Sequence, residues 1–193
     1  MALPSNAASS TAISAPFLAP DDIIRSSLLV DYELAGADVN DPSQGLQVQN
    51  WEARLSGNAM QCKPVSGSTW TTITSVASVT ELALAFDQNM RPAVAYVAGG
   101  VAYFYWYDTT PAAYVTTTLT SATSPICSMD DKRLAESQSR DMILCYIRAG
   151  TVYYRQQRDR FTIERSLGAV PSGKTRIRRW GMSEIYRFQL EFS

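Results

Sequence analysis

Two internal repeats constrain the fold of this 193-residue chain more than any other feature. Residues 70–87 (WTTITSVASVTELALAFD) and 113–130 (AYVTTTLTSATSPICSMD) share a Thr-rich strand pattern, a Ser/Thr turn, an apolar strand pattern and a closing Asp. Residues 93–108 (AVAYVAGGVAYFYWYD) match residues 143–159 (ILCYIRAGTVYYRQQRD) around a glycine turn, and a further Thr-strand equivalent follows at 161–167. A four-stranded unit that recurs about every 40–50 residues is typical of β-propeller blades or of a related antiparallel meander.

The turn residues within each unit support this interpretation. Asp87 and Asp130 each close an apolar strand pattern, and an Asp side chain can accept a hydrogen bond from a backbone N–H two residues further on. Gly99–Gly100 and Ala149–Gly150 stand between strand patterns, where a two-residue hairpin turn requires positive φ angles. We therefore expect tight turns at all four positions.

Alternation of apolar and polar residues predicts strands outside the repeats as well. Residues 28–34 and 186–192 alternate with period two and predict two amphipathic strands. Residues 46–55 also alternate, but the phase changes near Gln49–Asn50, where one extra residue would restore the facing. We expect one strand with a bulge there, or two short strands. Residues 131–140 (DKRLAESQSR) are polar and predict at most a surface turn of helix or a loop.

These patterns predict an all-β fold, an antiparallel meander with propeller-blade-like repeats that is incomplete in one chain. Residues 1–22 are expected to be an extended N-terminal arm, and residues 23–193 a single β-rich domain. The repeats lie at about 70–112 and 113–167, and a C-terminal hairpin at 174–193. Because a closed propeller needs about four to eight blades, we expect a homo-oligomer in which neighbouring chains complete exposed strand edges.

The arm is rich in Ala, Ser and Pro and lacks the basic start and continuous apolar stretch of a secretory signal. No run of about 18 apolar residues occurs, so we expect no membrane-spanning helix. The residues expected at subunit interfaces lie in the arm and in the terminal strand: Phe17, Leu18, Tyr186, Phe188 and Phe192.

The composition argues against an enzyme. The chain has no histidine, which excludes Ser-His-Asp and Cys-His sites and His-ligated zinc. Its three cysteines, Cys62, Cys127 and Cys145, form no C-x-x-C motif. Two of them lie inside apolar stretches, where a thiol is expected to pack as a small hydrophobic side chain. Asp130–Asp131 and the Asp38–Asp41 segment match no acid/base pair or calcium loop. We expect no catalytic residue, no metal and no cofactor.

The charge is uneven along the chain although the net charge is -1. Residues 1–147 carry 7 basic and 14 acidic side chains, whereas residues 148–193 carry 10 and 4. One interpretation is contact between the basic end of one copy and the acidic part of the next. A second is a solvated face formed by Arg155, Arg158, Arg160 and Arg165. A third is phosphate contact by Lys174, Arg176, Arg178 and Arg179 beside Trp180, although nucleic acid is not expected because Arg beside aromatic rings is equally normal at protein interfaces.

Five consecutive aromatic residues, 103–107 (YFYWY), fill one predicted strand. Alternation places Tyr103, Tyr105 and Tyr107 on one face and Phe104 and Trp106 on the other, and one of these faces must belong to the core. The tyrosines are candidate ligand-binding residues, because rings stack on sugar faces and hydroxyls form hydrogen bonds. The alternative is that both faces serve the core and a subunit interface.

Residues 140–167, the parallel hairpin at 93–108 and the closing segment RIRRWGMSEIYRFQLEFS together resemble structural proteins of tailed bacteriophages. The resemblance covers roughly residues 79–193. It is to the β-rich components at the distal end of the tail, or to the propeller-containing nozzle proteins of short-tailed phages. It implies a virion tail protein assembled in the host cytoplasm, which forms symmetric oligomers, contacts other tail proteins and carries no chemistry. A receptor- or carbohydrate-binding module at the tail tip, contacting the host surface, is the alternative.

Overall fold

The computed structural model describes residues 28–35, 46–64, 67–87, 89, 91–130, 141–182 and 188–193. These residues form antiparallel β-strands joined by turns and one short 3-10 segment, η2 (Gln157–Asp159). None of the described residues belongs to a helix long and apolar enough to cross a membrane. The all-β antiparallel prediction is therefore confirmed.

The strands form three four-stranded sheets and one two-stranded sheet, each a meander in chain order. The first sheet contains β1 (Leu28–Ala35), β2 (Leu46–Ser56), β3 (Ala59–Pro64) and β4 (Thr71–Ser75). The second contains β5 (Val79–Phe86), β6 (Pro92–Ala98), β7 (Val101–Asp108) and β8 (Ala113–Leu119). The third contains β9 (Thr123–Asp130), β10 (Asp141–Arg148), β11 (Thr151–Gln156) and β12 (Arg165–Ala169). The two-stranded sheet pairs β13 (Ile177–Met182) with β14 (Phe188–Phe192).

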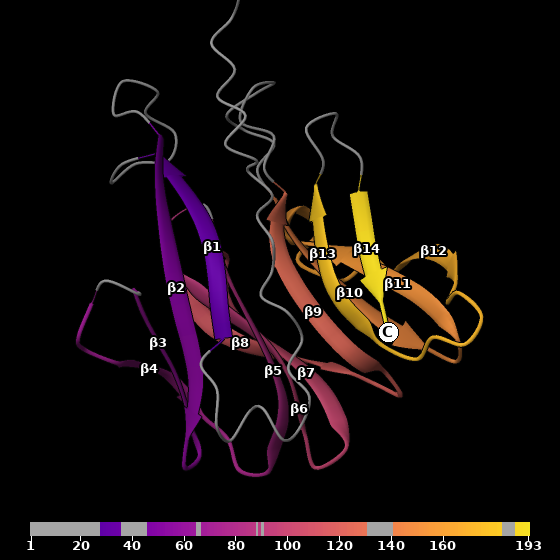
Figure 1. Cartoon of the computed structure of the whole chain (residues 1–193), viewed down its shortest axis with the longest axis horizontal. Coiled ribbons are helices and arrows are strands. Elements are labelled where there is room, and N and C mark those ends of the chain that lie inside the picture. Colours follow the sequence, from indigo (N-terminus) through magenta and orange to yellow (C-terminus); the bar gives the residue numbers. More distant parts are fainter. Residues whose placement is uncertain are drawn as a thin grey trace, which may run out of the picture.

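The leading strands of successive sheets pack against each other. β1 contacts β5, β5 contacts β9, and β9 contacts β13. Figure 1 shows the first sheet on the left and the third and two-stranded sheets on the right, with the second sheet between them. Among the described residues, the sheets thus form an open series of three four-stranded members and one two-stranded member. Whether the series belongs to a propeller stays a prediction.

The structure corrects one predicted strand and refines the repeat. β2 pairs with β1 without a register shift from Leu46 to Ala53, so the predicted bulge at Gln49–Asn50 is wrong. Residues 46–56 therefore form one strand without a bulge against β1. The Thr-rich strands β4 and β8 are hydrogen-bonded to the sheets before them, so each sheet begins one strand later than the sequence repeat. Residues 131–140, expected to be a turn or loop, lie outside the described residues.

The predicted turns occur where their residues are described. The Asp87 carboxylate accepts hydrogen bonds from the backbone N–H groups of Asn89 and Arg91, both at 2.9 Å. Gly99 and Gly100 have φ of 56° and 79°, the left-handed values that a tight hairpin needs. Ala149 and Gly150 repeat this geometry with φ of 48° and 74°. The Asp130 side chain lies outside the described part of the structure.

The second sheet is buried on both faces, which explains its nearly continuous apolar sequence. One face carries Leu82, Leu84 and Phe86 and packs toward the first sheet. The opposite face carries small residues, including Ala83 and Ala95, and packs toward the third sheet. Small side chains permit a close approach of the two sheets. The Cys127 thiol accordingly lies 3.6 Å from the Ala83 carbonyl oxygen.

The cysteines are free and buried, as the sequence predicts: Cys62, Cys127 and Cys145. Burial raises the pKa of the Cys62 thiol to about 11 and that of Cys127 to about 12. Since the thiolate is the reactive form, these thiols are inert in the folded protein.

Candidate interaction surfaces

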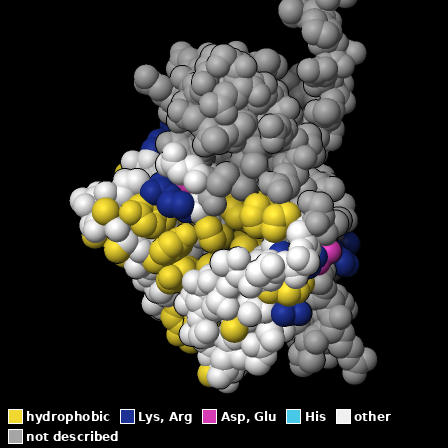
Figure 2. Space-filling model, turned by 90° about the vertical axis from the view of Figure 1, so that its left-hand side faces the viewer, with side chains coloured by type: hydrophobic (Ala, Val, Ile, Leu, Met, Phe, Trp, Pro, Cys, Tyr) yellow, Lys and Arg dark blue, Asp and Glu magenta, His cyan; other side chains and the backbone are white. Residues whose placement is uncertain are grey.

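The aromatic strand β7 divides its side chains as the sequence predicts. Phe104 and Trp106 are buried in the core shared with the third sheet. Tyr103 and Tyr105 are half-buried and pack against the core shared with the first sheet, and Tyr107 is half-buried as well. The candidate ligand-binding tyrosines therefore share one partly accessible face. Figure 2 shows a band of hydrophobic side chains on the face that it presents to the viewer, among the residues that are coloured.

Neighbouring rings occupy much of this tyrosine face. Tyr103 stacks on Tyr96 at 5.3 Å between ring centroids, and Tyr105 stacks on Tyr114 at 4.8 Å. Tyr107 meets the same Tyr114 ring edge-on at 5.3 Å. Because one face of Tyr103 and one face of Tyr105 is already stacked, the rings form a cross-strand ladder more than a flat platform.

An arginine and an aspartate lie at the Tyr107 end of this row of rings. The Arg91 guanidinium lies 3.9 Å from the centroid of the Tyr107 ring and is held by an ion pair to Asp87 at 2.6 Å. Burial, followed by the nearby carboxylate of Asp87, raises the pKa of Tyr114 to about 12. At neutral pH the Tyr114 hydroxyl is therefore a neutral hydrogen-bonding group.

A loop between β11 and β12 fastens the third sheet to the second. Phe161 is buried and lies edge-on to Phe104 and to Trp106, with ring centroids 4.8 Å away in both cases. The preceding Arg160 donates to the buried Asp108 carboxylate through Nε at 3.1 Å and Nη2 at 2.5 Å. Arg160 and Phe161 both have left-handed φ values, 54° and 56°. We call residues 157–164 the clasp, because they join the two sheets through one aromatic and one ionic contact.

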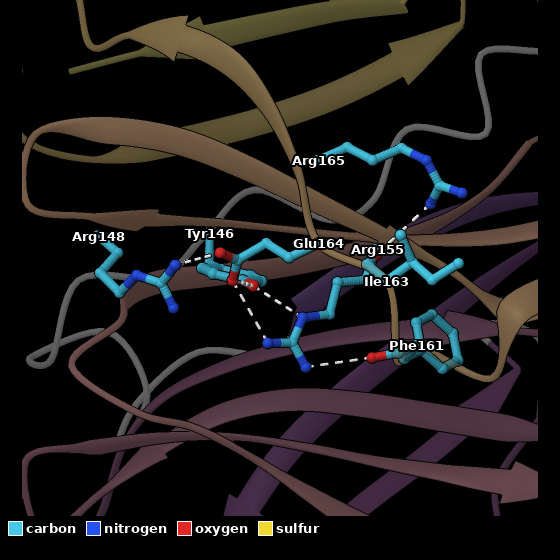
Figure 3. Close-up of polar contacts among 7 residues, drawn as sticks. All are labelled: Tyr146, Arg148, Arg155, Phe161, Ile163, Glu164 and Arg165. Carbon is cyan, nitrogen blue, oxygen red and sulfur yellow. Dashed lines mark hydrogen bonds and ion pairs between the residues drawn. The ribbon is translucent and has the colours of Figure 1, made fainter.

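A polar cluster holds the clasp on its own sheet (Figure 3). Glu164 accepts hydrogen bonds from Tyr146 and Arg148, and from Arg155 at 3.3 Å. Arg155 also donates to the Tyr146 hydroxyl at 2.8 Å and to the Phe161 carbonyl at 3.1 Å. Burial alone would raise the pKa of Glu164, but the hydrogen bonds from its three partners outweigh burial and hold it below its ordinary value. The cluster fixes loop geometry by charge-assisted bonds.

The arginines of the basic C-terminal part bind carboxylates of their own chain. In addition to the ion pairs of Asp108 and Glu164, Arg165 forms an ion pair with Asp159 at 2.6 Å and Arg176 forms one with Glu81 at 2.7 Å. The Arg176–Glu81 pair joins β5 to the segment before β13. These intramolecular pairs use guanidinium groups that the solvated-face and phosphate interpretations assumed to be available. Arg178 is exposed.

The predicted interface residues are only partly described. Phe17, Leu18 and Tyr186 lie outside the described residues, and Phe188 is described only as part of the β14 backbone. Phe192 is half-buried and packs against the chain's own core together with Leu190. The face of β14 that carries Leu190 and Phe192 therefore packs on the chain's own core.

The described residues contain no group of His, Cys, Asp and Glu side chains that could hold a metal ion. The Asp38–Asp41 segment lies outside the described ranges. The clasp escaped sequence analysis because residues 161–167 matched the Thr-strand pattern. An isolated Phe beside an Arg-rich turn was the signal that could have identified it.

No family model, curated protein or solved structure matches this chain. We therefore infer a function from the geometry of the described residues and from the resemblance of the sequence to phage tail proteins.

The clasp predicts a specific acid sensitivity. The hydrogen bonds from Arg160 lower the pKa of Asp108, as those of its three partners lower the pKa of Glu164. A carboxyl group with a lowered pKa stabilises the fold above its unfolded pKa, about 4, and this stabilisation is lost as pH falls through the folded value. We expect the melting temperature to fall between about pH 5 and pH 2 more steeply for wild type than for the double variant Asp108→Asn, Glu164→Gln. Parallel curves would contradict this role of the clasp carboxylates.

Proposed function

We propose that this protein is a structural subunit of a bacteriophage tail, in the tail tip or a distal tail ring. Subunits join through β contacts and through the N-terminal arm into a symmetric homo-oligomer that binds other tail proteins. Its role in this proposal is mechanical and needs no chemical step.

One observation carries the proposal: the series of sheets is open. Three four-stranded sheets follow one another and the fourth has two described strands. No strand of the first sheet is hydrogen-bonded to the last among the described residues. Strand edges attract further strands unless they are covered, so an open series favours completion by other chains. The distribution of charge, acidic before residue 148 and basic after it, favours the same head-to-tail contact.

The resemblance to phage tail proteins supports the setting. Residues 93–108, 140–167 and 176–193 carry it, and they include the repeated hairpins and the final sheet. Arms that tie subunits together fit a segment as rich in Ala, Ser and Pro as residues 1–22.

The arm provides the test. A variant without residues 1–22 should keep the β-sheet circular dichroism and melting behaviour of the full chain but sediment as a smaller species, because many weak contacts around a ring depend on each arm. The full-length chain in the same buffer is the control. Full-length protein that stays monomeric up to high concentration, or normal particles assembled from the shortened chain, would refute the proposed role.

A second candidate, a receptor- or carbohydrate-binding module, is favoured by the accessible side of the tyrosine face. Tyr114 is 36% exposed, and Tyr103, Tyr105 and Tyr107 are half-buried beside it. Rings of this kind stack on sugars through the face that no neighbour covers. Variants of Tyr103, Tyr105 and Tyr107 test this candidate.

A further inference from the structure

We propose that the outer edge of β14 is the docking site for residues 1–22 of a second copy of this chain. The arm adds a strand to the two-stranded sheet and lays an apolar side chain over the outer part of the third sheet. This inference rests on the proposed function, because it specifies which edge the arm of a neighbouring subunit occupies.

Among the described residues, no strand is hydrogen-bonded to the outer backbone edge of β14. Ser193 and Arg176 exchange both of their N–H···O bonds, at 3.0 Å and 3.1 Å. Since alternate residues of an antiparallel strand direct their N–H groups to opposite sides, Leu190 and Phe192 direct theirs away from β13. Among the described strands, β14 pairs only with β13. The register shift in this sheet adds a residue to β13, not to β14.

The other outer edges are less suited to an added strand. β4, β12 and β14 have five residues each, but the register shifts of β4 and β12 place the extra residue in the edge strand itself. Such shifts twist an edge away from a partner. β8 is the exception, because its seven residues pair with β7 without a shift. β8 is therefore the competitor that an experiment must include.

The outer strands of the third sheet carry partly exposed apolar side chains. Phe104 on β7 is buried by the third sheet and by Phe161. Its counterpart in the repeat, Tyr154 on β11, is only half-buried, and Leu167 on β12 is 44% exposed. A strand added to β14 would occupy the third position of its sheet, as β7 does in the second sheet. Since β7 contacts β9 of the neighbouring third sheet, we expect the added strand to contact the third sheet from the side of the two-stranded sheet.

The arm has the composition and charge for this position. Ile13, Ala15 and Phe17 alternate with polar or small residues, as an added strand with one apolar face requires. Residues 1–22 contain Asp21 and Asp22 and no basic residue, whereas Lys174 and Arg178 are exposed basic side chains at and beside β13. An extended segment of 22 residues reaches about 70 Å, enough to cross to a neighbouring subunit. We therefore assign the arm of a second copy to this edge.

Crosslinking between two singly substituted full-length chains tests this assignment. One preparation carries Ser14→Cys in the arm and the other carries Glu191→Cys on β14, and they are mixed and treated with a short bis-maleimide. The native thiols are buried, so wild type is the background control. We expect a product of twice the 21.3-kDa chain mass that contains both chains, at least tenfold more abundant than in a mixture of Ser14→Cys with Thr118→Cys on β8.

Each other outcome has a definite meaning when the same samples are examined by sedimentation. Oligomers whose arm crosslinks to β8, or to neither edge, overturn the β14 assignment and leave the assembly role intact. A Ser14→Cys, Glu191→Cys double variant that crosslinks only within one chain overturns the claim that a second copy supplies the strand. Monomers at every concentration overturn both this assignment and the proposed function.

Discussion

Replacing Phe161 with Ala should lower the free energy of unfolding by about 3–5 kcal/mol. The Phe161 ring is 1% exposed and fills the space between Phe104 and Trp106, which belong to another sheet. Removing it leaves a cavity between two sheets whose strands share no hydrogen bonds across that contact. Urea denaturation followed by tryptophan fluorescence measures the loss directly, because Trp106 loses a ring contact.

The matched control is Ile163→Ala, two residues further along the same loop. Ile163 is 50% exposed, so its truncation should change the free energy of unfolding by no more than about 0.5 kcal/mol. If Phe161→Ala costs less than 1 kcal/mol, the clasp does not join the sheets energetically. Its two left-handed residues, Arg160 and Phe161, would then be held by polar contacts: the Arg160–Asp108 ion pair and the bond from Arg155 to the Phe161 carbonyl.

The strands and turns could be predicted because their signals are local. Period-two alternation predicts β1 and β14. The dipeptides Gly99–Gly100 and Ala149–Gly150 predict the two hairpin turns that they form. The repeat predicted four-stranded units because each unit carries its own turn residues. Alternation also divided β7 correctly, since Phe104 and Tyr105 differ in burial.

The contacts between sheets could not be predicted, because they depend on residues far apart in the chain. Nothing in the sequence around Arg160 indicates Asp108, 52 residues earlier, as its partner. The Thr-rich strand β4 was assigned to the unit that follows it, because sequence order does not show which neighbour accepts its hydrogen bonds. The bulge predicted at Gln49–Asn50 assumed that apolar residues keep one face. β2 instead stays in register.

Pairing with acidic residues also changed the interpretation of the basic segment. In one interpretation of the sequence, Arg155, Arg160 and Arg165 are predicted to share one solvated face. In the structure Arg155 binds Glu164, Arg160 binds Asp108 and Arg165 binds Asp159. Ion pairs of this kind fix loops and leave less positive charge available to a partner. In the proposed assembly, head-to-tail contact would then depend on other cations, such as the exposed Arg178 on β13.

The last prediction separates a structural tyrosine face from a receptor-binding one. Replacing Tyr103, Tyr105 and Tyr107 together with Ala removes the ring stacks to Tyr96 and Tyr114. We expect a loss of roughly 1–2 kcal/mol for each half-buried ring, measured by chemical denaturation. The triple Phe variant keeps the stacks and should keep nearly full stability.

The Phe variant also tests whether the tyrosine hydroxyl groups bind a receptor, because it removes these groups and keeps the rings. A receptor that hydrogen-bonds to these tyrosines would be lost, so particles carrying the Phe variant would assemble but adsorb at least tenfold less to host cells. Because the ring faces are largely used by the ladder itself, we expect unchanged adsorption and full assembly. A stable Ala variant that assembles normally but no longer adsorbs would reverse this conclusion and make the tyrosine face the functional surface.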